Sequence, residues 1–125
     1  MEFFADRQER QAFPLKGGHI GGVVHPLFSH LPKDHARRTG PGAPEKLDLH
    51  LHRYGPGGFT RKNKHENLEQ AYFILEGQMH AEVGGEERLA GPGTCVMIPR
   101  DTEHSFENAG EGDLVFLLVQ VRPLE

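Results

Sequence analysis

The sequence has little cysteine, no surplus of positive charge and little uninterrupted apolar sequence, and each shortage excludes a class of protein. Its one cysteine, Cys95, leaves no partner for an intrachain disulfide. With no histidine near it in sequence, we expect Cys95 to be a small buried hydrophobe. Lys and Arg number 14 against 18 Asp and Glu, for a net charge of -4, so the basic surplus that nucleic-acid binding normally requires is missing.

Long apolar segments are also missing. The longest apolar run, Leu114–Val119, is far shorter than the roughly 20 residues of a membrane-spanning helix. The first ten residues carry an acid where a signal peptide would carry its positive charge, and no apolar stretch follows them. We therefore expect a soluble, cytoplasmic protein without a membrane or nucleic-acid partner. Its 125 residues are enough for one domain with a core of its own.

Glycine and proline, by contrast, are abundant. The 16 Gly and 9 Pro are spread along the chain and indicate many turns with little helix. Short segments between them alternate apolar and polar residues, which is typical of strands. We expect strands at 19–28, 46–54, 70–77, 79–83, 94–99, 105–108 and 113–121, and turns at 55–58, 84–85 and 91–93. This spacing predicts an all-β protein, an antiparallel sandwich or barrel.

The chain divides into two parts by composition. Residues 1–45 are expected to form an N-terminal arm and loop, packed on the barrel or on a neighbouring subunit, and residues 46–125 the barrel itself. Residues 29–45 combine three prolines and two glycines with almost no apolar content. They predict a long exposed loop.

Nine histidines are many for a chain of this length. His50 and His52 lie two residues apart on one face of an expected strand, a spacing that can bind a metal ion. The leucines at 47–51 alternate with them and are the expected core face, which puts both histidines outside, in solvent or in a subunit contact. The other histidines without a partner at ligand spacing are expected at the surface or an interface: His19, His25, His30, His35 and His80.

The segment PRDTEHSFEN, Pro99–Asn108, carries the clearest motif. His104 follows Pro99 by five positions, and Asn108 follows His104 by four. These residues resemble the second signature segment of the cupin superfamily, whose members are jelly-roll (double-stranded β-helix) barrels of antiparallel strands. Asp101 replaces the family's glycine, and aspartate tolerates left-handed turn conformations better than most residues. The resemblance to a small single-domain, conserved-barrel cupin implies the same fold here.

The family's first signature segment is matched more loosely, before Gly77. Counting back over six residues from Gly77 puts Gln70 at the family's acidic ligand position, and four further residues put His65 at the second histidine of its His-x-His pair. Asn63 stands at the first. The resemblance implies a mononuclear site for divalent Fe, Mn, Ni, Co or Zn, with His65, Gln70 and His104 as ligands and Asn63 as a fourth ligand or pocket residue. The alternative is an eroded site without metal.

Other residues near this segment have two interpretations each. Tyr72 shares a strand face with Gln70 and is expected to line the pocket, either offering its hydroxyl for proton transfer or filling the core. Arg61, Lys62 and Lys64 form a basic cluster that either attracts an anionic substrate to the barrel mouth or is simply solvated.

Three functions stay open on this evidence. The first is a metal-dependent enzyme acting on a small organic substrate, of the dioxygenase, isomerase, decarboxylase or lyase type that the resemblance offers. The second is a non-catalytic cupin that binds a small ligand without a functional metal. The third is a stability or assembly partner without a ligand. The resemblance also implies a homodimer that exchanges the segment 19–28.

Overall fold

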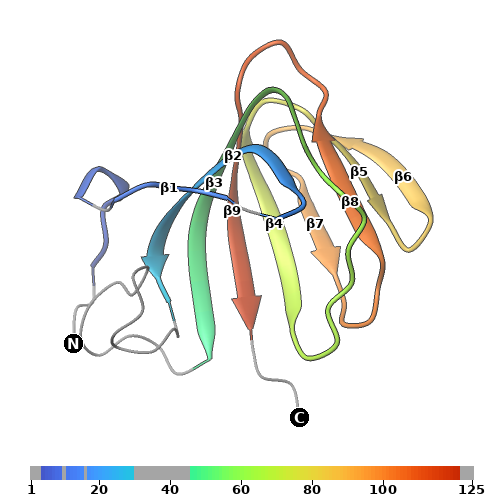
Figure 1. Ribbon diagram of the computed structural model, residues 1–125, viewed down its shortest axis with the longest axis horizontal. Helices are drawn as coiled ribbons and strands as arrows, with labels where there is room; N and C mark the ends of the chain where they lie inside the picture. Colours follow the sequence, from blue (N-terminus) through green and yellow to red (C-terminus); the bar gives the residue numbers. More distant parts are fainter. Residues whose placement is uncertain (1–3, 10, 16, 30–45, 122–125) are drawn as a thin grey trace.

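Antiparallel strands make up most of the computed structural model, which describes residues 4–9, 11–15, 17–29 and 46–121. In these residues nine strands form one sheet, after a short 3-10 turn, η1 (Arg7–Glu9) (Figure 1). The strands are β1 (Phe13–Pro14), β2 (His19–Phe28), β3 (Leu47–Thr60), β4 (Glu69–Glu76), β5 (Met79–Val83), β6 (Glu86–Ala90), β7 (Cys95–Ile98), β8 (His104–Asn108) and β9 (Leu114–Val121). The predicted all-β architecture is confirmed. The described part of the chain contains no helix long and apolar enough to cross a membrane.

Strand β3 connects the two halves of the sheet. The strand order is β6-β5-β8-β3-β9-β4-β7, with β2 also paired to β3 and β1 to β2. Residues 47–54 of β3 pair with β9, whereas Phe59, near the other end, pairs with Glu107 of β8. The sheet therefore curls nearly into a barrel, with β2, β3, β9, β4 and β7 on one side and β8, β5 and β6 on the other (Figure 1).

The glycines at 55–58 bend β3 and do not end it, so the turn predicted there was wrong. Gly57 has a φ of 79°, which favours glycine. A Cβ on Gly58 would lie 3.0 Å from the carbonyl oxygen of Gly55 and 3.1 Å from that of Ile20. Without side chains in the way, the backbone bends sharply and one strand reaches both β9 and β8.

The two faces of β3 are opposite to those predicted. The alternate residues from Asp48 to Tyr54, including His50 and His52, face the inside of the barrel and are at most 8% exposed. The leucines at 47–51 face outward, where they are half-buried or buried against apolar residues of β9 in register with them. Alternation identifies the residues that share a face, but both faces of this strand are largely covered, and alternation alone does not say which is inside.

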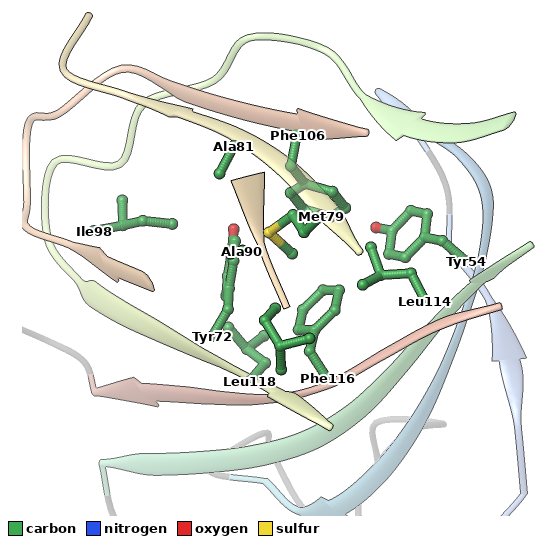
Figure 2. Close-up of a cluster of buried hydrophobic side chains, with 11 residues drawn as sticks. Tyr54, Tyr72, Met79, Ala81, Ala90, Ile98, Phe106, Leu114, Phe116 and Leu118 are labelled. Atoms are coloured by element: carbon green, nitrogen blue, oxygen red, sulfur yellow. The ribbon is translucent and has the colours of Figure 1, made fainter. Parts of the chain in front are cut away.

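The apolar core fills part of the barrel interior (Figure 2). Tyr54, Tyr72, Phe106 and Phe116 pack together, with ring centroids 4.9 Å apart in both the Tyr54–Phe106 and the Tyr72–Phe116 pairs. Aliphatic side chains complete the cluster: Ile74, Met79, Ala81, Ala90, Ile98, Leu114 and Leu118. Aromatic pairs in such geometries add about 0.5–1.5 kcal/mol each beyond the area they bury, so this cluster should contribute strongly to the stability of the barrel.

Strand β2 holds the described N-terminal residues against the barrel. Its pairing with β3 runs from His19 opposite Thr60 to Phe28 opposite Leu49, and it continues past Pro26 with a register shift. Ser29, the first residue of the exposed loop predicted at 29–45, is buried. The rest of that loop, with His30 and His35, lies outside the described residues. The predicted homodimer, with exchange of 19–28, stays a prediction that light scattering can test.

Candidate functional site

A cavity of about 480 Å³ lies inside the barrel, beside the aromatic core. Its volume is in the range of about 300–1,000 Å³ typical of small-molecule sites. Histidines, aromatic rings and amides dominate its wall. The lining residues are Leu15, Gly18, His19, His50, His52, Tyr54, Thr60, Arg61, Lys62, Asn63, His65, Gln70, Tyr72, His104, Phe106, Phe116, Leu118 and Gln120.

All five residues that the sequence predicted for the site line this cavity. Gln70 and Tyr72 come from β4, His104 from the start of β8, and Asn63 and His65 from the segment between β3 and β4. The His65 and His104 rings are close, with centroids 5.2 Å apart. The fold thus brings together residues from three separate segments, and their role as metal ligands stays a prediction.

Backbone hydrogen bonds hold the two histidines in place. Asn63 and His104 each donate a backbone N–H to the other's carbonyl oxygen at 2.9 Å, and Asp101 donates its N–H to the carbonyl of His65 at 2.7 Å. Asp101 has a φ of 58°, which confirms the left-handed turn expected at this position. The turn before His104 therefore also anchors the segment that carries His65.

The His104 ring has a defined hydrogen-bond partner. Its Nδ1 lies 2.9 Å from the carbonyl oxygen of Thr102. A carbonyl only accepts, so Nδ1 must carry the proton, and in the neutral ring Nε2 keeps a lone pair. This is the arrangement that metal-binding histidines usually have.

Gln70 belongs to a buried chain of polar side chains. Its Nε2 donates to Gln120 Oε1 at 2.7 Å, and Gln120 Nε2 donates to Asp48 Oδ2 at 2.9 Å. On the cavity side, the Tyr72 hydroxyl donates to Gln70 Oε1 at 3.4 Å. The series of amide hydrogen bonds thus ends at the Gln70 oxygen, next to the Tyr72 hydroxyl.

His50 and His52 are cavity residues, so the predicted outer position was wrong. Their rings are stacked, with centroids 6.1 Å apart, and the Nε2 atom of each is buried. His52 also stacks on Phe116 at 5.2 Å. One sequence signal pointed this way: Tyr54 is on the same face as both histidines, and a large aromatic residue is more typical of the inner face of a barrel strand.

His19 also lines the cavity, so its predicted position at the surface or an interface was wrong. Its Nδ1 forms a 2.8 Å hydrogen bond with the Tyr54 hydroxyl. Burial, and then the neighbouring His104, lower the pKa of His19 below its usual value. Burial raises the pKa of Tyr54 and Tyr72 well above their usual value, so both hydroxyls stay protonated and able to donate.

The charge around the cavity is one-sided. No Asp or Glu is among its lining residues in the described part of the chain, whereas Arg61 and Lys62 line it and are exposed. Lys62 also forms an ion pair with Glu82 at 3.3 Å, while Lys64 does not line the cavity. Such a lining disfavours a cationic organic ligand and tolerates a neutral or anionic one.

Cys95 and two further histidines lie elsewhere. Cys95 is exposed on the outer side of β7, opposite Phe73 of β4, so its predicted burial was wrong. The inward positions of this short strand are taken by Val96 and Ile98. His80 lies near surface carboxylates as expected, and His25 is half-buried on β2.

The donor atoms fit a metal ion only with the help of an amide. No group of three or more His, Cys, Asp or Glu is placed to hold a metal ion in residues 4–9, 11–15, 17–29 and 46–121. His65 Nε2 lies 3.5 Å from Asn63 Nδ2, a long contact that a metal ion would displace. A divalent ion here would therefore bind two imidazoles and the neutral oxygen of Gln70, a donor set suited to Zn, Cu, Fe or Ni more than to Mg or Ca.

The comparison with known families decides what this barrel is. The Cupin domain family, Cupin_2, matches residues 50–120, more than half of the chain. The chain is a cupin. The predicted membership and jelly-roll barrel are confirmed, and the match spans both histidine segments.

Similar proteins show how far the likeness of this cupin extends. An uncharacterized protein of Methanocaldococcus jannaschii, MJ1618, is 33% identical over 67 residues, 54% of each protein, so the chain spans about half the length of that relative. The solved structure of the polyketide cyclase RemF from Streptomyces resistomycificus is 26% identical, with a TM-score of 0.78 over 100% of this chain and 81% of RemF. KdgF from Halomonas sp. is 20% identical, with a TM-score of 0.73 over 98% and 96% of the two chains, and supports the fold alone.

Proposed function

We propose that the cavity is the active site of a metal-dependent enzyme that acts on a small organic molecule. The observation that carries the proposal is the convergence of His65, His104 and Gln70 on one cavity of about 480 Å³, with the Tyr72 hydroxyl bonded to the same glutamine. Two imidazoles and one oxygen donor leave several coordination positions open for a substrate.

The residues around the metal position have separate roles in this proposal. A bound divalent ion would supply a Lewis acid for a carbonyl or enolate oxygen of the substrate. The Tyr72 hydroxyl, kept protonated by burial, donates its one hydrogen to the Gln70 oxygen and can accept a hydrogen bond from a substrate hydroxyl. The Tyr54 hydroxyl, also kept protonated, is hydrogen-bonded to His19. The four rings of the aromatic cluster exclude water from one side of the cavity.

The lining favours a neutral or anionic substrate with an aromatic or enolic part. It has aromatic rings, hydroxyl groups and a basic rim at Arg61 and Lys62, and its described lining residues include no carboxylate. The likeness to the polyketide cyclase RemF agrees with such a substrate. We therefore place β-diketones and phenols first, before keto acids, in a panel that tests dioxygenation, isomerisation, decarboxylation and lyase chemistry.

A non-catalytic cupin that binds a small ligand is the second candidate. The neutral donor set favours it, because an amide in place of a carboxylate lowers metal affinity by removing a negative charge. Ligand binding by the metal-free protein, with no turnover in the metal-loaded protein, would select this candidate.

Metal binding by His104 and its control tests the proposal. We expect wild-type protein to bind about one equivalent of Fe, Mn, Ni, Co or Zn by elemental analysis and calorimetry. His104→Ala should weaken this binding about tenfold or more. His80→Ala, at the surface near Glu87 and Glu107, should leave it unchanged. A wild-type protein that binds none of these ions, or equal binding by wild type and His104→Ala, would contradict the proposal.

A further inference from the structure

Three polar side chains form a ladder across the middle of the sheet. Asp48 of β3 lies opposite Gln120 of β9, and Gln120 lies opposite Gln70 of β4. The hydrogen bonds between their side chains measure 2.9 Å and 2.7 Å. The ladder therefore follows the strand register and does not depend on a loop.

All three side chains are buried. Asp48, Gln120 and Gln70 are 1%, 5% and 8% exposed. A buried donor or acceptor that loses its partner is strongly unfavourable, and an amide turned the wrong way would place two donors or two acceptors against each other. The orientation of each amide is thus constrained by its neighbours.

The carboxylate of Asp48 fixes the direction of the whole ladder. An ionised carboxylate only accepts hydrogen bonds, so Gln120 must turn its NH2 group toward Asp48. The Gln120 oxygen then faces Gln70, and Gln70 must donate its own NH2 group. The Gln70 oxygen is left pointing at the Tyr72 hydroxyl, on the cavity side.

We propose that Asp48 is a positioning residue that makes Gln70 present its oxygen, and not its nitrogen, to the cavity. The same polarity explains why an amide occupies the position where the family has an acid: a carboxylate there would set its oxygens against the Gln120 oxygen. The acid of the ladder is thus Asp48, two hydrogen bonds away from the Gln70 oxygen. Only the statement that a metal ion or substrate contacts this oxygen rests on the proposed function.

Reversing the ladder provides the test. In Gln70→Glu, the Gln120 NH2 group cannot serve both the introduced carboxylate and Asp48, so one buried acceptor loses its partner. In the double variant Asp48→Asn/Gln70→Glu, the introduced amide can donate to the Gln120 oxygen, and Gln120 can donate to the introduced carboxylate. The double variant keeps the net charge of the wild type and pairs every group in the opposite direction.

We would measure urea unfolding of the wild type, both single variants and the double variant, all with EDTA. Gln70→Glu should shift the unfolding equilibrium about tenfold or more toward the unfolded state, and adding Asp48→Asn should recover most of that loss. Any other contact of Asp48 is lost equally with and without the position-70 change, so it cancels in the cycle. Additive effects, or a Gln70→Glu protein as stable as the wild type, would overturn the proposal.

Two further measurements keep the test decisive. If Gln70→Glu does not fold, a soluble double variant still supports the ladder, and an equally insoluble one overturns it. Gln78→Glu is the matched amide-to-acid control, because Gln78 is exposed and outside the ladder. Gln78→Glu should change the stability by the same amount with and without Asp48→Asn. If Asp48→Asn recovers stability in Gln78→Glu as much as it does in Gln70→Glu, the proposal is overturned.

Metal affinity separates the ladder from the proposed function. With Zn2+ or Mn2+ alone as the probe, Asp48→Asn should bind several-fold more weakly than wild type, because Gln70 is then free to turn its NH2 group toward the cavity. The double variant should bind about tenfold more tightly than wild type through its carboxylate. If the stability effects of the Asp48 and Gln70 changes are coupled in EDTA but none of the proteins binds metal, the ladder is supported and the metal site is rejected. If the proteins bind metal but the two stability effects are additive, the ladder is rejected and the metal site is still supported.

Discussion

The two walls of the cavity are built in different ways. The strand wall consists of inward side chains of β3, β9 and β4: His50, His52, Gln70, Tyr72, Phe116 and Gln120. The loop wall consists of Asn63 and His65, between β3 and β4, and of His104, the first residue of β8, which follows the turn at Asp101. Strand-wall residues are buried and placed by register. In the loop wall, Asn63 is exposed, His65 is half-buried and His104 is buried.

This difference separates stability from binding. The strand wall shares its aromatic rings with the core, so changes there should affect the folding of the whole domain. The loop wall depends on three backbone hydrogen bonds that join Asn63 to His104 and Asp101 to His65. Changes there should alter ligand placement with a smaller effect on folding.

The largest expected effect comes from Phe116, which is 1% exposed and contacts the rings of Tyr54, Tyr72 and Phe106. Phe116→Ala should lower the free energy of unfolding by about 3–5 kcal/mol. His65→Ala, in the loop wall, should change it by about 0.5 kcal/mol or less while weakening metal binding. Urea unfolding of both metal-free variants measures the contrast, and similar losses would end the distinction between the walls.

A middle-sized effect is expected at Asp101, whose φ of 58° is unfavourable for β-branched residues. Asp101→Val should destabilise the protein by about 1–2 kcal/mol and weaken metal binding, because the turn also fixes His65. Asp101→Gly is the control, since glycine adopts this conformation freely, and it should keep wild-type metal affinity. Thermal unfolding and calorimetry would show both, and an unchanged Asp101→Val protein would mean that this turn does not hold the loop wall.

The smallest expected effect is a pH dependence from His19, which reaches the cavity from β2. Its pKa is lowered in the folded protein, so below about pH 6.5 the unfolded chain binds more protons and stability falls as the pH falls. Above that value the contribution is fully present. His19→Gln should show a smaller loss between about pH 7.5 and about pH 5.5 in urea unfolding with EDTA. An unchanged loss would exclude His19 as a source of this pH dependence.

The sequence predicts the loop wall better than the strand wall. His65 and His104 were placed in the site by spacing within short motifs, and the left-handed turn at Asp101 was expected from its place in one of them. Gln70 is the strand-wall residue that the same spacing identified. Short motifs constrain the backbone locally, so they can be recognised without knowledge of the rest of the fold.

The strand wall depends on information that one segment does not contain. His50 and His52 were correctly placed on one face, but the choice of inner face depends on what covers the leucines on the other side. Cys95 was expected to be buried from its residue type and the lack of a nearby histidine, although β7 turns it outward. Gln70 is joined through Gln120 to Asp48, and the strand register brings these three residues together only in the folded sheet.

The position of β9 in the sheet sets the order in which the wall can be completed during synthesis. β9 lies between β3 and β4 and pairs with both. Asp48 and Gln70 leave the ribosome well before Gln120, because translation proceeds from the N-terminus. Until β9 is made, β3 and β4 each have an open edge where a foreign strand could pair. The nascent sheet is missing a strand at its centre, and no ligand can meet a finished cavity before residue 120 has been added.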